Sequence, residues 1–119
     1  GNSQNNHTSK SDRPERFYHG FVLGLIVELK GRYHISSNRE SGYGRYDVML
    51  EPVNDTDPAF VLEFKICEEG EKTLEDTVAA ARKQIQDKQY TSELEARGIK
   101  PERIRCYGVA FQGKKVLIG

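Results

Sequence analysis

The fold of this chain is decided by two short stretches, RYDVML at residues 45–50 and FVLEFKI at residues 60–66. Their apolar residues alternate or run together between turn-forming residues, a pattern that predicts two β-strands. The segment between them contains two prolines, an asparagine and two aspartates, which indicates a turn. We therefore expect a β-hairpin with a wide loop.

Side chains two residues apart in a strand lie on the same face of a sheet. One face of the second stretch is apolar and consists of Phe60, Leu62, Phe64 and Ile66. The opposite face can bring Asp47, Glu63 and Lys65 together. Carboxylates hold Mg²⁺ through hard oxygen ligands, and a bound metal stabilises charge on a phosphoryl oxygen. A solvated cross-strand ion pair is the alternative explanation of this triplet.

The residues around the hairpin add further motifs. They are FYHG at 17–20, NRESGYGRYD at 38–47, QI at 84–85, KQY at 88–90 and GVAFQGKKV at 108–116. With the Asp…Glu-x-Lys triplet, they resemble one branch of the PD-(D/E)XK nuclease superfamily. This branch is the nuclease-like domain usually found C-terminal to an AAA-type ATPase domain in bacterial proteins, abundant in gut Bacteroidetes. The resemblance runs from about Glu15 to the C-terminus and departs at Tyr46, which replaces the proline before the aspartate.

The resemblance implies an α/β (α+β) fold with a restriction-endonuclease-like core, a central mixed β-sheet flanked by helices. It also implies a phosphodiesterase that depends on Mg²⁺ or Mn²⁺ and hydrolyses DNA. Asp47 and Glu63 would hold the metal, with the Phe64 carbonyl as a further ligand. Lys65 would position the attacking water, and Gln84 would orient Lys65 or a phosphate.

Further positions are candidates for the same site. Members of the superfamily often place a residue from the first helix near the metal, which makes His19 a candidate beside an ordinary packed histidine. Glu40 lies in the loop before Asp47 and could add a ligand, or simply be a solvated carboxylate. Gln86 and Tyr90 match a Gln-x-x-x-Tyr spacing of related groups. On a continuous helix they point away from the apolar sector, so we favour Gln84 with Lys88, one turn apart.

The remaining chain predicts two helices and three more strands. The first helix begins at Asp12 with a capping-box pattern and ends at Gly31. It is apolar around most of its circumference, so we expect it to be largely buried, with Gly20 and Gly24 allowing close approach of another backbone. The other elements are a second helix from Leu74 to about Arg97 and strands at 32–37, 104–111 and 114–118. Gly108 predicts close backbone contact in the fourth strand.

Length and composition fit one folded domain of 119 residues. We assign residues 1–12 to a disordered linker or cloning remnant and residues 13–119 to the nuclease-like domain. The polar N-terminus has no signal-peptide pattern, and the two isolated cysteines indicate reduced thiols, so we expect a cytoplasmic protein. The net charge of zero argues against a strong generic nucleic-acid binder. It slightly favours the alternative of a catalytically silent domain that serves as an interaction or regulatory module. A third alternative, a dimeric junction resolvase, shares the same core but usually has a more basic surface; a homodimer is a further expectation.

Overall fold

The structure is a computed structural model and describes residues 12–39, 45–68 and 70–119. Its order of elements is one helix, three strands, two consecutive helices, a 3₁₀ turn and two strands. The bounds are α2 (Asp12–Leu29), β1 (Tyr33–Arg39), β2 (Arg45–Pro52), β3 (Ala59–Ile66), α3 (Leu74–Lys88), α4 (Tyr90–Ala96), η1 (Pro101–Arg103), β4 (Ile104–Gln112) and β5 (Lys115–Ile118). The predicted strands are present, and their ends agree with the prediction to within two residues.

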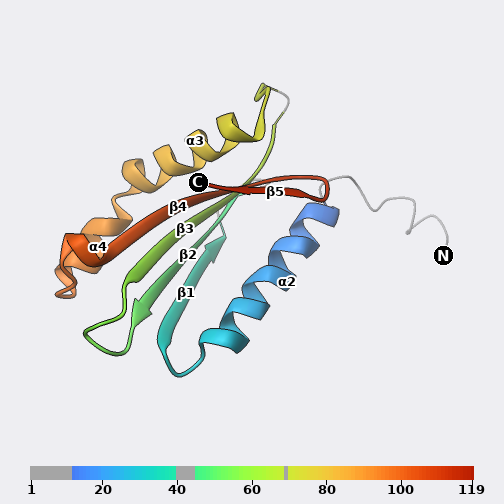
Figure 1. The fold of residues 1–119 in the computed structure, drawn as a ribbon. Coiled ribbons are helices and arrows are strands. Elements are labelled where there is room, and N and C mark those ends of the chain that lie inside the picture. Colours follow the sequence, from blue (N-terminus) through green and yellow to red (C-terminus); the bar gives the residue numbers. More distant parts are fainter. Residues whose placement is uncertain (1–11, 40–44, 69) are drawn as a thin grey trace.

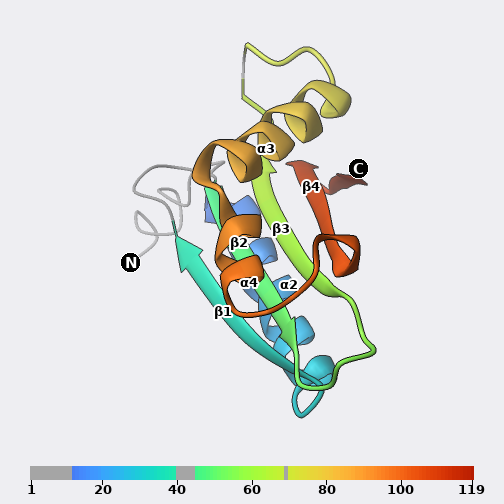
Figure 2. The same cartoon turned by 90° about the vertical axis from the view of Figure 1, so that its left-hand side faces the viewer.

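The strands form one five-stranded sheet in the order β1-β2-β3-β4-β5. β1, β2 and β3 are antiparallel neighbours, whereas β3 and β4 run parallel and are connected through α3 and α4. The sheet is therefore mixed, as predicted. Figure 1 shows α2 on one side of it and α3 on the other, and Figure 2 shows α3 and α4 in front of the strands with α2 behind.

Strand alternation divides the buried residues between the two faces. On the α2 face, Phe64 makes edge-to-face contacts with Phe21 of α2 and with Phe111 of β4, with ring centroids 5.4 and 5.9 Å apart. On the other face, Val61 of β3 packs with Ile85 of α3 and Leu94 of α4. The predicted hairpin and its apolar face are thus confirmed.

Gly108 of β4 allows α3 to lie close to the sheet. A Cβ atom at this position would be only 2.7 Å from the backbone oxygen of Val78 in α3. Real Cβ atoms do not approach an oxygen so closely, so only glycine fits without a shift of the helix. The close contact predicted for Gly108 is confirmed.

The predictions about α2 are wrong in two respects. Leu23 and Val27 are 61% and 76% exposed, so the helix is not largely buried. A Cβ atom at Gly20 or Gly24 would meet nothing within 4 Å among the described residues, so the backbone of these residues does not approach there. The apolar pattern of α2 exceeds what the sheet covers. Among the described residues, no helix has the length and hydropathy needed to cross a membrane.

The second helix also differs from the prediction, because it is interrupted at Gln89. This residue adopts a left-handed conformation with φ of 56° and separates α3 from α4. Gly98 follows α4 with φ of +96°, as expected for a residue just beyond a helix end. The break at Gln89 changes the direction in which Tyr90 points, which matters for the site.

Candidate functional site

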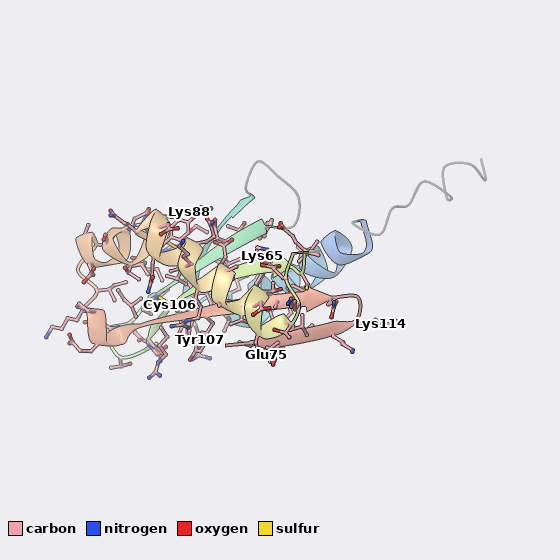
Figure 3. All side chains as sticks on the ribbon, turned by 90° about the horizontal axis from the view of Figure 1, so that it is seen from above. Lys65, Glu75, Lys88, Cys106, Tyr107 and Lys114 are labelled. Carbon is pink, nitrogen blue, oxygen red and sulfur yellow. The ribbon has the colours of Figure 1, made fainter. Side chains whose placement is uncertain are left out.

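Asp47, Glu63 and Lys65 lie on the face of the sheet that α3 covers. Asp47 of β2 is paired directly with Glu63 of β3, and directly opposed residues of antiparallel strands place their side chains on the same face. Lys65 is two residues further along β3 and shares that face. The predicted convergence of the triplet on one face is therefore present. Figure 3 shows Lys65 and Lys88 along the same side of α3.

All three side chains are withdrawn from water. Asp47 is 3% exposed, Glu63 is fully buried and Lys65 is 2% exposed. The alternative of a solvated cross-strand ion pair is therefore wrong. Burying charged groups costs free energy unless they are paired, hydrogen-bonded or bound to a metal. A domain of this size gains no obvious stability from two carboxylates placed side by side, so this arrangement points to a chemical role.

Asp47 is held from the end of α3 and the start of α4. The Tyr90 hydroxyl donates a hydrogen bond to Oδ2 of Asp47. The Lys88 ammonium lies 3.9 Å from the same oxygen and 5.8 Å from the centre of the Tyr90 ring. The expectation that Tyr90 points away from the sheet is wrong, because it assumed an unbroken helix. Gln86 is exposed, whereas Tyr90 packs against the core.

Lys65 is held from the loop between β3 and α3. Its Nζ atom donates to Glu71, with both carboxylate oxygens at 2.9 Å. Glu71 also accepts hydrogen bonds from the Glu68 backbone N–H at 2.9 Å and the Thr77 hydroxyl at 3.0 Å. Burial raises the pKa of the Glu71 carboxyl, but these hydrogen bonds and the lysine charge outweigh it, so the pKa lies below its usual value.

Of the remaining predicted site residues, Gln84, His19 and Glu40, the structure describes only the side chain of Gln84. Gln84 is half-buried on α3 and makes no hydrogen bond with the residues that the structure describes. His19 lies in α2, but its side chain is outside the described part of the chain, as is the whole of Glu40. The catalytic roles of Gln84, His19 and Glu40 therefore stay predictions.

Sequence reasoning missed Glu71, which accepts hydrogen bonds from Lys65, and Thr77, which donates a hydrogen bond to Glu71. Glu71 lies in an acidic turn of ordinary appearance, and no spacing rule relates it to a strand lysine six residues earlier. The spacing between Gln86 and Tyr90 did indicate Tyr90 as a site residue. We set it aside because a continuous helix would point Tyr90 away from the apolar sector. The left-handed residue that reverses this conclusion is a glutamine, a residue type with no special preference for that conformation.

The carboxylate pair fits a hard divalent cation. Mg²⁺ and Mn²⁺ prefer oxygen ligands, and Mg²⁺ is commonly held by one or two carboxylates, with water or phosphate in its other positions. Asp47 and Glu63, opposed across β2 and β3, would supply two such ligands. Within the described ranges, no group of three or more His, Cys, Asp or Glu side chains forms a ready-made metal cluster. The pair would thus need water, substrate or backbone oxygens to complete the coordination.

One of the comparisons with known proteins identifies a family. The model of one protein family, described as the PD-(D/E)XK nuclease superfamily, matches residues 13–119. No curated protein and no solved structure gives a significant match. Members of the superfamily generally use divalent metals, and its mixed sheet between helices is the architecture found here. Because the match spans nearly the whole chain, the protein belongs to the PD-(D/E)XK nuclease superfamily.

Proposed function

We propose that this domain is a metal-dependent nuclease that hydrolyses phosphodiester bonds of DNA. One observation carries the proposal: Asp47 and Glu63 are opposed and buried on one sheet face, with Lys65 beside them. Stability does not call for two like charges in this position, whereas a site for a divalent cation does. Membership of a nuclease superfamily supports the same conclusion.

Each residue has a distinct role in the proposed reaction. Asp47 and Glu63 would hold Mg²⁺ or Mn²⁺, with the Phe64 carbonyl as a further ligand. The metal, when bound, lowers the pKa of a ligated water and stabilises charge on the phosphoryl group. Lys65 donates hydrogen bonds that orient the attacking water or a phosphate oxygen. Tyr90 and Lys88 hold the Asp47 carboxylate in place.

The bond changes are those of in-line hydrolysis. Water attacks phosphorus on the side opposite the leaving sugar oxygen, the new P–O bond forms, and the bond to that sugar oxygen breaks. The proton of the water must be removed, and the leaving alkoxide must be protonated. Little covalent chemistry falls to the protein, so positioning and charge stabilisation supply most of the catalysis.

The parent protein and its location are part of the proposal. The sequence motifs at residues 17–20, 38–47 and 108–116 are similar to those of domains that follow an AAA-type ATPase domain. We infer that this domain follows such an ATPase domain in a cytoplasmic bacterial protein. A homodimer stays a prediction.

A second function is favoured by a specific observation. The three charged side chains are almost fully buried, and the Lys65 ammonium is already bound by Glu71. A catalytically silent domain that serves as an interaction or regulatory module could retain such a closed cluster. The exposed apolar residues Leu23 and Val27 of α2 would suit a protein partner of that module.

The Lys65→Ala variant separates the two functions. It removes the water-positioning group but keeps both metal carboxylates and leaves the apolar face of β3 untouched. Because a positioned catalytic group typically contributes roughly 10²–10⁴-fold, cleavage of DNA with Mg²⁺ or Mn²⁺ should fall by at least about a hundredfold. DNA binding should lose about one phosphate contact, seen as a slightly shallower salt dependence.

Two results would count against this proposal in different ways. If the wild type cleaves no duplex, single-stranded or branched DNA, the regulatory module becomes the better explanation. If cleavage survives Lys65→Ala intact, the domain is a nuclease but the role given to Lys65 is wrong. Circular dichroism of both proteins should show that the variant keeps its fold.

A further inference from the structure

We propose that Glu71 is a positioning residue for the cleavage reaction, which acts by fixing the Lys65 ammonium in place. The inference rests on the proposed function and assigns a role to a loop residue outside the Asp…Glu-x-Lys triplet. Glu71 itself need not touch substrate or metal, because its effect reaches the reaction through Lys65.

Glu71 is held by groups from three parts of the fold. Lys65 is on β3, the Glu68 N–H is in the connecting loop, and the Thr77 hydroxyl is in the first turns of α3. Thr77 is fully buried and therefore fixed by packing. A carboxylate with donors on three sides cannot rotate without losing a hydrogen bond. Glu71 is thus a rigid acceptor rather than a mobile surface charge.

This rigid acceptor determines where the lysine ammonium lies. A lysine side chain has several rotatable bonds, so ordering it costs conformational entropy. The Lys65 side chain is only 3% exposed, so bulk water does not replace Glu71 as its partner. An ammonium has three N–H donors, and the two oxygens of Glu71 can engage two of them. The third can then be directed at a water molecule or a phosphate oxygen.

Glu68 provides a comparison within the same loop. Its carboxylate lies 3.7 Å from the same Lys65 Nζ, but its side chain is 62% exposed. Exposed ion pairs contribute little and impose little order. Glu71, in contrast, is 16% exposed and lies 2.9 Å from the ammonium. Two acidic side chains thus approach one lysine, and only Glu71 has the geometry to fix it.

A double-mutant cycle on kcat tests whether Glu71 acts through Lys65. Glu71→Gln keeps the size of the side chain but removes its charge. Because misplacement by about 1 Å can cost roughly a hundredfold, we expect kcat to fall at least about tenfold, with KM changed by less than about twofold. The matched control Glu68→Gln should keep kcat within about twofold. In the Lys65→Ala background, Glu71→Gln should cause no further loss.

The opposite pattern in this cycle would overturn the inference. If Glu71→Gln lowers kcat by the same factor with and without Lys65, the residue acts on the fold or elsewhere in the site. Melting curves for all four proteins ensure that each is folded at the assay temperature. If Glu71→Gln lowers the melting temperature but leaves kcat unchanged, the Glu71–Lys65 ion pair is purely structural, and the inference is wrong.

Chemical labelling provides a readout that does not need nuclease activity. An amine-acylating reagent followed by mass spectrometry should label Lys65 far more slowly than the exposed Lys114 in the wild type. Glu71→Gln should accelerate labelling of Lys65, whereas Glu68→Gln should not. Equal labelling of Lys65 and Lys114 in the wild type would overturn the inference even if DNA is cleaved. Protection of Lys65 without any wild-type cleavage would defeat the proposed function, and with it the role of Glu71.

Discussion

Phe64 and Glu63 are neighbours in β3, and both side chains are completely buried, but they lie on opposite faces of the sheet. Phe64 packs against Phe21 and Phe111, so its burial removes apolar surface from water. Glu63 is opposed to Asp47, so its burial brings two carboxylates together away from solvent. Equal burial therefore has opposite meanings on the two faces, stabilisation on one and a candidate chemical site on the other.

The helices that cover these faces also differ. α3 lies so close to β4 that Gly108 leaves no room for a side chain. It carries Thr77 and Lys88, which reach Glu71 and Asp47. α2 leaves Leu23 and Val27 in solvent and has open space around Gly24. The tightly seated helix is the one that positions charged groups, which is the arrangement that a preorganised site requires.

The largest expected effect is the difference in stability between substitutions at Phe64 and at Glu63. Phe64→Ala should lower the free energy of unfolding by about 3–5 kcal/mol, because it leaves a cavity between α2 and the sheet. Glu63→Gln keeps the shape of its side chain and removes the repulsion from Asp47, so it should cost less than half as much. Urea denaturation of the three proteins measures both values. A larger loss for Glu63→Gln would mean that the charged face also stabilises the fold.

The next effect contrasts the seating of the two helices. Gly108→Ala forces a Cβ atom against the backbone of α3 and should destabilise the protein by about 1–3 kcal/mol. Gly24→Ala meets no neighbouring atom and improves helix propensity, so it should stabilise the protein by up to about 1 kcal/mol. Thermal melts of the two variants would show shifts of opposite sign. Destabilisation by both would indicate that α2 is seated as closely as α3.

The face of each residue in the hairpin could be predicted from the sequence, because strand alternation requires only the pattern of apolar residues. Phe64 and Glu63 were assigned to opposite faces in this way. The close contact at Gly108 was also predicted, from a glycine within a strand. The partners of the charged residues could not be predicted. Tyr90 reaches Asp47 only because Gln89 breaks the helix, and the burial of α2 depends on how much sheet is available to cover it. Glu71 meets Lys65 through the path of a loop, which local patterns do not encode.

Binding of a divalent cation provides the last and smallest contrast between the faces. Two opposed carboxylates repel each other, and a cation that binds only the folded state relieves this and stabilises it. At a Mn²⁺ concentration of ten times Kd, the gain is about 1.4 kcal/mol, or a rise in melting temperature of roughly 4–6 °C. Asp47→Ala should lose most of this rise relative to its own metal-free melting temperature.

A matched control distinguishes this site from general binding of cations to acidic surface. Asp55→Ala removes an exposed carboxylate from the β2–β3 loop, remote from Glu63, and should keep the full rise. Differential scanning fluorimetry with and without millimolar Mn²⁺ gives all three shifts. If Asp47→Ala rises as much as the wild type, the cation binds elsewhere, and the buried carboxylates no longer identify the α3 face as the metal-binding face. If only Asp47→Ala loses the rise in melting temperature, the cation binds at the buried carboxylates. The face covered by α3 is then the metal-binding face, and the face covered by α2 serves only as apolar core.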